Sequence, residues 1–527
     1  MKKIRIILFL LISFVFVEAY ADIKGDLSWY NASQRPNYYE ISDVSDYEGL
    51  IYLINELSIS FASDTIAIVS DMSLVNCVSL NKFDGILIGN KHIISDLSEP
   101  LIATIENGGI VDGLIFDSSC KVSYGEDLGM VARICNGLII NCINYGNLTR
   151  NNSDYRIGGI CGKLSKGKIL GCVNYGSVIC STSDIQTVLR AGGICAYADS
   201  ESVIMGCNNH GDITASASRY SIIGGIVGDL QNSIIENCVN YGNVSSQIIG
   251  LASLTSSQFI QYTGGIIGQA QSNSTINMCS NYGEISNNTQ YVSGIIASAD
   301  NTNIYNCGNY GNVTSTNGYF YSGASGICSK YNAITLDNNK FFLNCLNTGT
   351  IVSKTSNAIA TAAGICIGIN HANIGNLLNY GTISASATGL NSYEFKIQQY
   401  ESDGCNILSE ISTIEDANTF VKNYTNEPQL VMWRSNDNGI ISLSNIFSYD
   451  IEPYQGIAIV NCYSDSIDEY ILEYSTDEYK NKISFKNDTT LIGLKPNAKY
   501  DYAIYDSNRT KQSMGDFQHF LLTLIYR

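Results

Sequence analysis

The amino-acid sequence predicts an all-β protein built on a parallel β-helix solenoid, with a cap at each end and a small β-sandwich after it. Two repeated patterns indicate the coil. An octad with Asn fourth, Gly sixth and an aliphatic residue eighth occurs eight times, and a short Gly-Gly-Ile-type element precedes each copy. In addition, the number of residues from each short element to its octad is nearly constant, whereas the number from each octad to the next short element varies. Solenoids whose insertions lie on one side behave this way.

The octads predict which side chains lie on top of one another. They run Asn141–Leu148, Gly171–Val178, Gly206–Ile213, Asn237–Val244, Met278–Ile285, Asn306–Val313, Asn344–Ile351 and Asn376–Ile383. Seven carry Cys at the second position, and the last has Leu377. Turns stacked about 4.8 Å apart would align these residues in ladders of Cys, Asn and aliphatic side chains. Stacked Asn amides bond one another and the corner backbone, which explains the Asn without a ligand.

Strands fit the repeats better than helices do. The apolar pieces are short and are broken by Gly and Asn, whereas helical repeats need long amphipathic runs of good helix formers. Ile, Val and Tyr favour strands, and Asn-Gly or Tyr-Gly steps supply the bends between them. We therefore expect about three short strands per turn.

Residues 1–21 are predicted to be a secretory signal peptide. Basic residues precede an apolar run from Ile6 to Val17, and Ala19-Tyr20-Ala21 suits cleavage near Ala21. The apolar run is too short for a membrane span, and no other stretch is long enough. The sequence thus predicts a protein that is secreted or displayed on the cell surface.

Residues 22–106 are predicted to form an N-terminal cap and the first rungs, and residues 107–390 the repeating coil. A short helix is expected over Tyr47–Leu57 and a strand over Thr65–Met72. The stretch Phe83–Asn90 is expected to pair onto the coil as its first rung. An uncovered β-helix end would present unpaired backbone groups, so a cap is physically required.

The motifs resemble those of a known group of proteins. Gly-Gly-Ile-x-Gly followed by x-Cys-x-Asn-x-Gly-x-Ile, after the Phe83–Asn90 lead-in, resembles GLUG motifs, which occur in exported bacterial surface proteins, including some immunoglobulin A1 proteases. The resemblance covers roughly residues 40–390 and implies a right-handed coil. It does not extend to a protease zinc site, because His-Glu-x-x-His is absent. The four histidines are scattered: His92, His210, His371 and His519.

Two further segments follow the coil. Residues 391–443 are predicted to be a C-terminal cap or linker, with a helix over Ile414–Tyr424 and with Trp433–Leu443 closing the far end. Residues 444–527 are predicted to be a β-sandwich. Within it, Leu491–Tyr502 resembles the corner between strands E and F of a fibronectin type III domain, with Leu494 in the core and Tyr500 as the corner tyrosine.

The seventeen cysteines invite three interpretations: disulfides, a metal site or buried thiols. No Cys-x-x-Cys spacing supports zinc. Ladder cysteines would have parallel Cβ vectors about 4.8 Å apart, against a preferred Cβ separation near 3.8 Å in a disulfide, so bridging would strain both rungs. We therefore predict a buried column of thiols, which pack as small apolar groups.

Tyrosines form two predicted rows. Those at the fifth octad position are expected to stack along one edge as part of the structure. A second row precedes the short elements and is the candidate ligand-binding surface, because aromatic side chains in line can meet sugar rings or a partner protein. The alternative is that this second row only covers the loops. Its members are Tyr155, Tyr220, Tyr262, Tyr291 and Tyr321.

Charge excludes some classes of partner. The formal net charge is −18, so the chain is a poor candidate for binding nucleic acid or anionic lipid. Acidic residues within the repeats do not recur in register and are interpreted as isolated; the one position that Asp212 and Glu284 share is interpreted as solvated. These acidic residues are Asp212, Asp229, Glu236, Glu284 and Asp300. On these grounds we predict a protein that is not an enzyme, with no cofactor and no metal.

The predicted function is adhesion or binding of a glycan or a host or matrix protein by a monomer, through the variable loops of the coil. One alternative is a polysaccharide-active lyase or hydrolase, and another is a structural spacer. A carboxylate cluster with perturbed proton affinity would favour the enzyme, whereas a smooth face of Tyr, Ser and Asn would favour binding. Sequence alone names no ligand.

Overall fold

The protein is described from a computed structural model. It covers residues 25–31, 37–123, 125–151, 156–249, 260–288, 290–317, 321–333, 340–356, 358–388, 391–395, 406–407, 413–426 and 428–435. Beyond residue 435 it describes the backbone of eight strands between residues 441 and 518. In the described residues no helix is long and apolar enough to cross a membrane.

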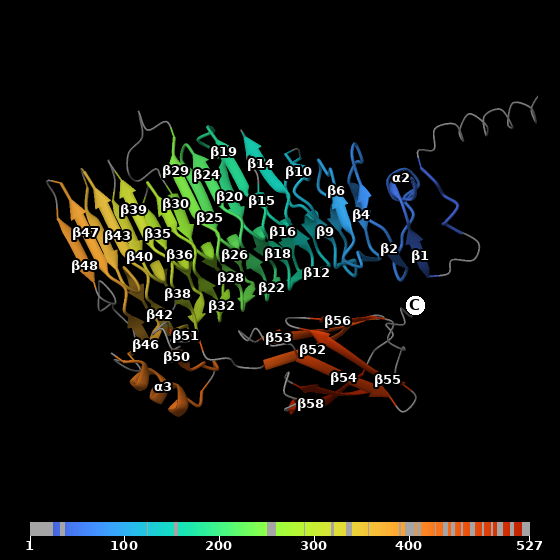
Figure 1. The fold of residues 1–527 in the computed structure, drawn as a ribbon. Helices are drawn as coiled ribbons and strands as arrows, with labels where there is room; N and C mark the ends of the chain where they lie inside the picture. Colours follow the sequence, from blue (N-terminus) through green and yellow to red (C-terminus); the bar gives the residue numbers. More distant parts are fainter. Residues whose placement is uncertain are drawn as a thin grey trace, which may run out of the picture.

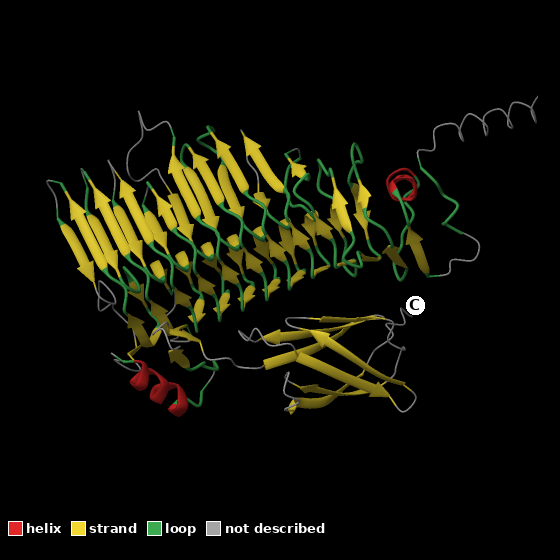
Figure 2. Ribbon diagram, viewed as in Figure 1, coloured by secondary structure: helices red, strands yellow, loops and turns green. Residues whose placement is uncertain are grey.

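The predicted parallel β-helix is confirmed (Figure 1, Figure 2). From residue 156 onward each turn contributes strands to four sheets, whereas three short strands per turn were expected. One turn runs through β15 (Arg156–Gly158), β16 (Cys161–Ser165), the pair β17 (Lys168–Leu170) and β18 (Val173–Asn174), and β19 (Val178–Thr182). The first residue of each octad takes positive φ. In most turns this bend separates two short strands that belong to the same sheet. That position therefore holds Asn or Gly in seven copies and Met278 in one.

Four parallel sheets result, here named A to D. Sheet D contains β15, β20 (Val188–Gly192), β25 (Tyr220–Gly224), β30 (Ile260–Gly264), β35 (Tyr291–Ser293), β40 (Ser322–Ser325), β44 (Ala360–Ala363) and β48 (Ser392–Phe395). Sheet B contains β4 (Leu80–Phe83), β7 (Ile102–Ile105), β11 (Ala132–Cys135), β16, β21 (Cys195–Asp199), β26 (Val227–Gln231), β31 (Ile267–Gln271), β36 (Ile296–Asp300), β41 (Cys328–Asn332) and β45 (Ile369–Asn370). Sheet C contains β10 (Lys121–Val122), β14 (Asn147–Asn151), β19, β24 (Ile213–Ala217), β29 (Val244–Ile248), β34 (Ile285–Asn287), β39 (Val313–Asn317), β43 (Ile351–Thr355) and β47 (Ile383–Ala387).

Sheet A is the longest because most turns contribute two strands to it. Its strands are β1 (Tyr38–Ile41), β2 (Thr65–Ile68), β3 (Met72–Ser73), β5 (Ile86–Ile88), β6 (Ile93–Ser95), β8 (Ile110–Asp112), β9 (Ile115–Phe116), β12 (Leu138–Ile140), β13 (Ile143–Asn144), β17, β18, β22 (Val203–Met205), β23 (Asn208–Asn209), β27 (Ile234–Glu236), β28 (Val239–Asn240), β32 (Thr275–Asn277), β33 (Ser280–Asn281), β37 (Asn303–Tyr305), β38 (Gly308–Asn309), β42 (Phe341–Asn347), β46 (Asn373–Asn379) and β49 (Asn406–Ile407).

The predicted Asn ladder lies inside the corner between sheets A and C. Each Asn Nδ2 donates to the carbonyl of the Gly two residues on and to Oδ1 of the next Asn, at 2.7–2.9 Å between ladder amides. The ladder runs Asn144, Asn174, Asn209, Asn240, Asn281, Asn309, Asn347 and Asn379. The glycines beside it must be glycines: a Cβ on Gly176 would lie 1.7 Å from the carbonyl oxygen of Gly146.

The cysteines are buried thiols, as predicted. All fifteen cysteines whose side chains are described are buried and free. Burial raises the pKa of the Cys135 and Cys180 thiols to about 12. These side chains therefore act as uncharged packing groups in the core.

Both predicted helices outside the coil form, but the C-terminal segment lies on the side of the coil and not over its end. The predicted N-terminal helix forms as α2 (Val44–Ile51), followed by a π-helical turn (Tyr52–Glu56), and Asp43 caps its first turn. The C-terminal helix α3 (Ile414–Asn423) also forms. It lies with Trp433 against the outer face of sheet A, packed on Leu346 and Leu378 (Figure 1). This segment covers the side of the last turns, where apolar residues would otherwise be exposed.

The last strands form two antiparallel sheets. One has the order β52 (Ser448–Tyr454), β53 (Ile457–Tyr463), β56 (Thr489–Ile492). The other has the order β55 (Tyr479–Phe485), β54 (Tyr470–Thr476), β57 (Lys499–Tyr505), β58 (Lys511–Gln518). Between them and the coil, β50 (Trp433–Ser435) pairs with β51 (Ile441–Leu443). Leu494 lies outside the described residues, and the side chain of Tyr500 is not described.

Candidate functional site

Three of the five predicted ligand-binding tyrosines form one group. Tyr262 and Tyr291 have ring centroids 5.9 Å apart, and Tyr291 and Tyr321 have centroids 5.5 Å apart. Tyr321 fills the space over Gly323, where a Cβ would meet its ring at 2.8 Å. Tyr220 lies two residues out of register with Tyr262, opposite Ile260, and stacks with Arg219 instead. Tyr155 lies outside the described residues.

The group is more buried than a solvent-facing row would be. Tyr262 is 7% exposed and packs with Ile222 of sheet D and Ala297 of sheet B in a small apolar cluster outside the main core. Burial raises the pKa of Tyr262 and of Tyr291. The outer faces of sheets B and D therefore meet, and this meeting line runs along the coil.

The strand pairing in sheets B and D places a set of charged residues on the same line along the coil. On sheet D, Arg156, Arg190, Ile222, Tyr262 and Tyr291 occupy successive paired positions. On sheet B, the facing column is Lys163, Tyr197, Asp229, Gln269 and Ser298. We call these ten residues the junction strip. It has a charged end, beginning at Arg156 and Lys163, and an aromatic end at Tyr262 and Tyr291.

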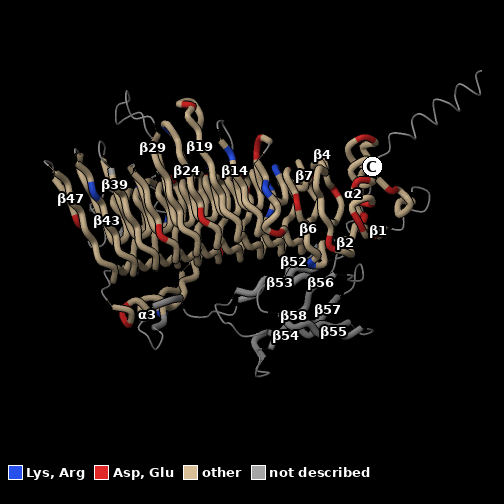
Figure 3. Tube along the Cα trace, turned by 45° about the horizontal axis from the view of Figure 1, so that its top comes forward, with Lys and Arg blue, Asp and Glu red and all other residues tan. Residues whose placement is uncertain are grey.

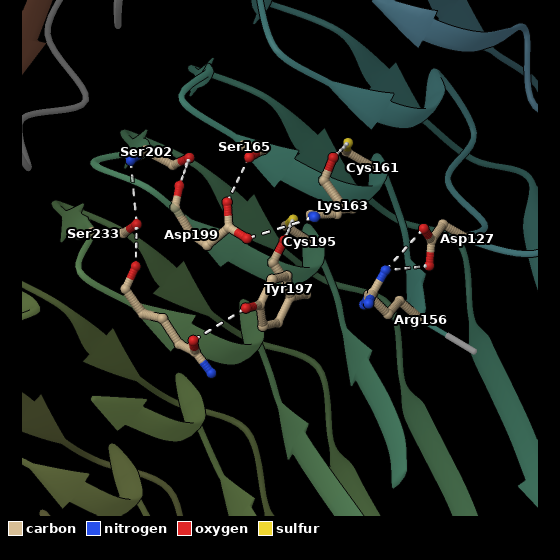
Figure 4. A network of polar contacts seen from close by, with 11 residues as sticks. Asp127, Arg156, Cys161, Lys163, Ser165, Cys195, Tyr197, Asp199, Ser202 and Ser233 are labelled. Carbon is tan, nitrogen blue, oxygen red and sulfur yellow. Dashed lines mark hydrogen bonds and ion pairs between the residues drawn. The ribbon is translucent and has the colours of Figure 1, made fainter. Parts of the chain in front are cut away.

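Ion pairs organise the charged end (Figure 4). Arg156 Nη1 donates to both carboxylate oxygens of Asp127 at 3.0 Å. Lys163 Nζ lies 3.6 Å from Asp199 Oδ2, and Ser165 Oγ donates to Asp199 Oδ1 at 2.6 Å. One turn further on, Arg190 Nε donates to Asp229 Oδ2 at 2.8 Å and joins the two sheets. Other charged residues are scattered along the coil (Figure 3).

Tyr197 lies at the centre of the three cations. The guanidinium carbons of Arg156 and Arg190 are 5.0 and 5.6 Å from its ring centroid, and Lys163 Nζ is 5.7 Å away. These distances suit cation–π attraction. Its hydroxyl donates to Gln231 Oε1 at 3.1 Å (Figure 4). The ring thus holds three positive groups in place without neutralising them.

Burial perturbs the acidic groups of this cluster. The side chain of Asp229 is 2% exposed; desolvation raises the pKa of this carboxyl, and its ion pair with Arg190 opposes the rise. Its Oδ1 has no hydrogen-bond partner among the described residues. Desolvation also raises the pKa of Asp127 against the influence of Arg156. Burial, with the nearby carboxylates of Asp199 and Asp229, raises the pKa of Tyr197. Perturbed groups that converge in this way mark candidate functional sites.

The interpretation of Asp229 as an isolated residue is wrong. Sheet packing buries it at the junction, beside an arginine that lies 39 residues earlier in the chain. The sequence held one overlooked signal: Arg156 and Arg190 both stand two residues before the first Gly of a short element. Equal spacing from that Gly implies adjacent positions in sheet D.

The aromatic row predicted at the fifth octad position forms over five of its six tyrosines, with one addition; Thr348 stands between Tyr310 and the sixth, Tyr380. Rings at the fifth octad position stack in parallel with centroids 4.6–5.3 Å apart. The row is Tyr145, Tyr175, His210, Tyr241, Tyr282 and Tyr310. His210 takes the place of a tyrosine, and burial lowers its pKa. Among the described residues, no group of three or more His, Cys, Asp or Glu could hold a metal ion.

Comparison with known proteins identifies no family. No protein-family model matches the chain, and no curated protein matches it. A crystal structure from Bacteroides ovatus, provisionally described as an immunoglobulin A1 protease, is similar at 16% identity and a TM-score of 0.30, over 77% of this chain and 91% of the other. A structure named IgA1 protease is similar at 18% identity and a TM-score of 0.36. The match covers 57% of this chain and 22% of that one, so this chain spans less than a quarter of its length.

These names correct one prediction. We predicted that the chain is not an enzyme, yet both similar structures carry the name of a protease, and the prediction no longer stands. With TM-scores of 0.30 and 0.36, neither likeness assigns an activity, a substrate or a site to this chain. What the chain does must be argued from its own residues.

Proposed function

We propose that this is an exported β-helix protein that binds an extended glycan along the junction strip. One observation carries the proposal: register aligns two arginines, one isoleucine and two tyrosines from five successive turns in a single line. Turns repeat about every 4.8 Å, so the line from Arg156 to Tyr291 spans roughly 19 Å. Such a length suits a polymer chain rather than a single sugar.

The chemistry of the strip supports a carbohydrate. Aromatic rings pack against the apolar faces of sugars, while Arg, Lys, Gln and Ser side chains bond their hydroxyl groups. The strip supplies both kinds of group, because the column that begins with Arg156 and Arg190 continues through Ile222 and the buried Tyr262 to the partly exposed ring of Tyr291. Export rests on the signal-like residues 1–21.

Two further assignments belong to the same proposal. The repeats are related to GLUG motifs through the patterns given above. The last domain is a fibronectin type III-like module. The three-stranded and four-stranded antiparallel sheets support that assignment, because this division of seven strands is typical of such sandwiches.

Binding is tested with the chain from Asp22 onward on a glycan array, followed by titration calorimetry of any glycan bound. Tyr291→Ala should weaken binding on the order of tenfold, since stacking of an aromatic ring contributes about 1 kcal/mol or more. Tyr38→Ala is the matched control: it removes an exposed tyrosine from β1, far from the strip. No glycan bound by the wild-type chain, or equal affinity for both variants, would refute the proposal.

A second candidate is a polysaccharide-active enzyme at the charged end. The raised pKa of Asp127 and of Asp229 favours it, because burial that raises the pKa of a carboxyl is one of the ways in which a general acid is made. Incubation with each bound polysaccharide, followed by an assay for new reducing ends, tests for cleavage. Asp229→Asn should abolish turnover and retain binding if the carboxyl acts chemically. Absence of cleavage with every bound glycan would leave binding as the function.

A further inference from the structure

Positive charge is concentrated in one part of an acidic chain. Residues 121–219 contain nine Lys and Arg and seven Asp and Glu, a net charge of +2, whereas the whole chain has −18. The three cations around Tyr197 come from this segment. An anion approaching the coil would therefore be attracted to this region more than to any neighbouring turn of the acidic chain.

Apolar packing does not by itself require cations at these positions. Arg156 and Arg190 are register neighbours about 4.8 Å apart, and like charges directly opposite each other in a sheet are destabilising. The same position holds Ile222 and Tyr262 in the next two turns, so an apolar side chain fits the fold there. Asp127 and Asp229 each pair with one of the two guanidinium groups and reduce their repulsion. A ligand anion that bridges both groups would reduce it further.

The arginines keep donors available. Arg156 uses Nη1 for Asp127, and its Nε is buried without a partner. Arg190 uses Nε for Asp229, and its two terminal nitrogens make no hydrogen bond to the described residues. Both side chains are partly exposed, at 33% and 23%. Planar guanidinium groups bind carboxylate and sulfate through paired hydrogen bonds.

We propose that the charged end of the junction strip selects an acidic polysaccharide, and that Arg156, Arg190 and Lys163 bind carboxylate or sulfate groups on its sugars. This inference rests on the proposed glycan binding and names the class of glycan. Tyr197 positions the cations, and Tyr291 at the other end contacts a neighbouring sugar unit. Lys163, whose ammonium is 3.6 Å from Asp199, supplies a third positive charge to the same surface.

The test compares charged and neutral oligosaccharides of equal length with the chain from Asp22 onward. Oligogalacturonate carries carboxylates, heparan sulfate fragments carry sulfates, and xylohexaose is neutral. We expect at least one acidic probe to bind more than tenfold tighter than xylohexaose, and its affinity to fall as NaCl rises from 50 to 500 mM. Arg156→Gln should weaken the acidic probe by on the order of tenfold to a hundredfold, because a charge-assisted hydrogen bond is lost.

Matched variants separate binding from folding. Lys354→Gln removes an exposed cation from β43 in sheet C and should leave affinity unchanged. Arg190→Gln alone would leave Asp229 buried and unpaired, so the double variant Arg190→Gln/Asp229→Asn removes both charges and should fold while losing affinity for the acidic probe. If neutral and acidic probes bind equally, or if the arginine variants bind the acidic probe like wild type, the inference is overturned. Tyr291-dependent binding of a neutral glycan would still support the proposed function; no glycan binding at all would refute both.

Discussion

Removing one amide from the Asn ladder should destabilise the coil strongly. Asn240 is fully buried; its Nδ2 donates to the Gly242 carbonyl and to Asn281 Oδ1, both at 2.8 Å. Its Oδ1 accepts from Asn209 Nδ2 at 2.8 Å. Asn240→Ala leaves the Gly242 carbonyl, Asn281 Oδ1 and Asn209 Nδ2 without this partner in a buried corner. At about 1–3 kcal/mol for each group left unpaired, and allowing for relaxation, we expect a loss of about 3–6 kcal/mol.

Equilibrium unfolding in urea, followed by far-UV circular dichroism, measures this loss. Asn243→Ala is the matched control, because Asn243 is in the same turn but exposed, and its Oδ1 accepts a single bond from the Glu284 backbone. The control should cost less than about 1 kcal/mol. Asn240→Asp adds a sign test: a buried carboxyl with a raised pKa is stable when protonated, so this variant should be more stable at pH 4.5 than at pH 7.5. If Asn240→Ala and Asn243→Ala unfold at the same urea concentration, the ladder does not hold the corner as argued.

Three other predictions concern titration and thiols. Burial raises the pKa of Asp112 to about 6, so the folded state binds this proton more tightly than the unfolded state. The free energy of unfolding should therefore fall as pH rises from about 4 to about 6. Asp112→Asn should flatten that slope in thermal melts recorded across this range. Burial lowers the pKa of His210, so stability should fall as pH drops below about 6.5. His210→Tyr, which completes the tyrosine stack, should remove this loss. A melting temperature of the variant that drops between pH 7.5 and pH 5 as much as that of wild type would contradict this prediction. Native alkylation with iodoacetamide, read by mass spectrometry, should spare the fifteen buried thiols and modify them only after unfolding; labelling of Cys172 or Cys238 in the native protein would show that the column is open.

The sequence by itself determined the coil and its interior. Each octad repeats a requirement that one turn must satisfy locally: a left-handed corner at Asn237, a buried thiol at Cys238, an amide for the ladder at Asn240 and close backbone approach at Gly242. Because equivalent residues of a parallel solenoid lie directly over one another, a repeat in the sequence becomes a ladder in space. The α2 and α3 helices were predictable for a similar reason, since their signals are local.

Only the tertiary structure decided the candidate site. Asp127, Arg156, Tyr197 and Asp229 belong to four different turns and fit no shared motif, so each resembles an isolated surface residue in the sequence. The number of faces per turn determines which outer columns meet, and a three-strand turn would have placed sheets B and D differently. Their junction buries Asp229, groups three cations around Tyr197 and packs Tyr262 against Ala297. Desolvation and charge proximity are properties of that packing, and the chain order of the residues does not encode them directly.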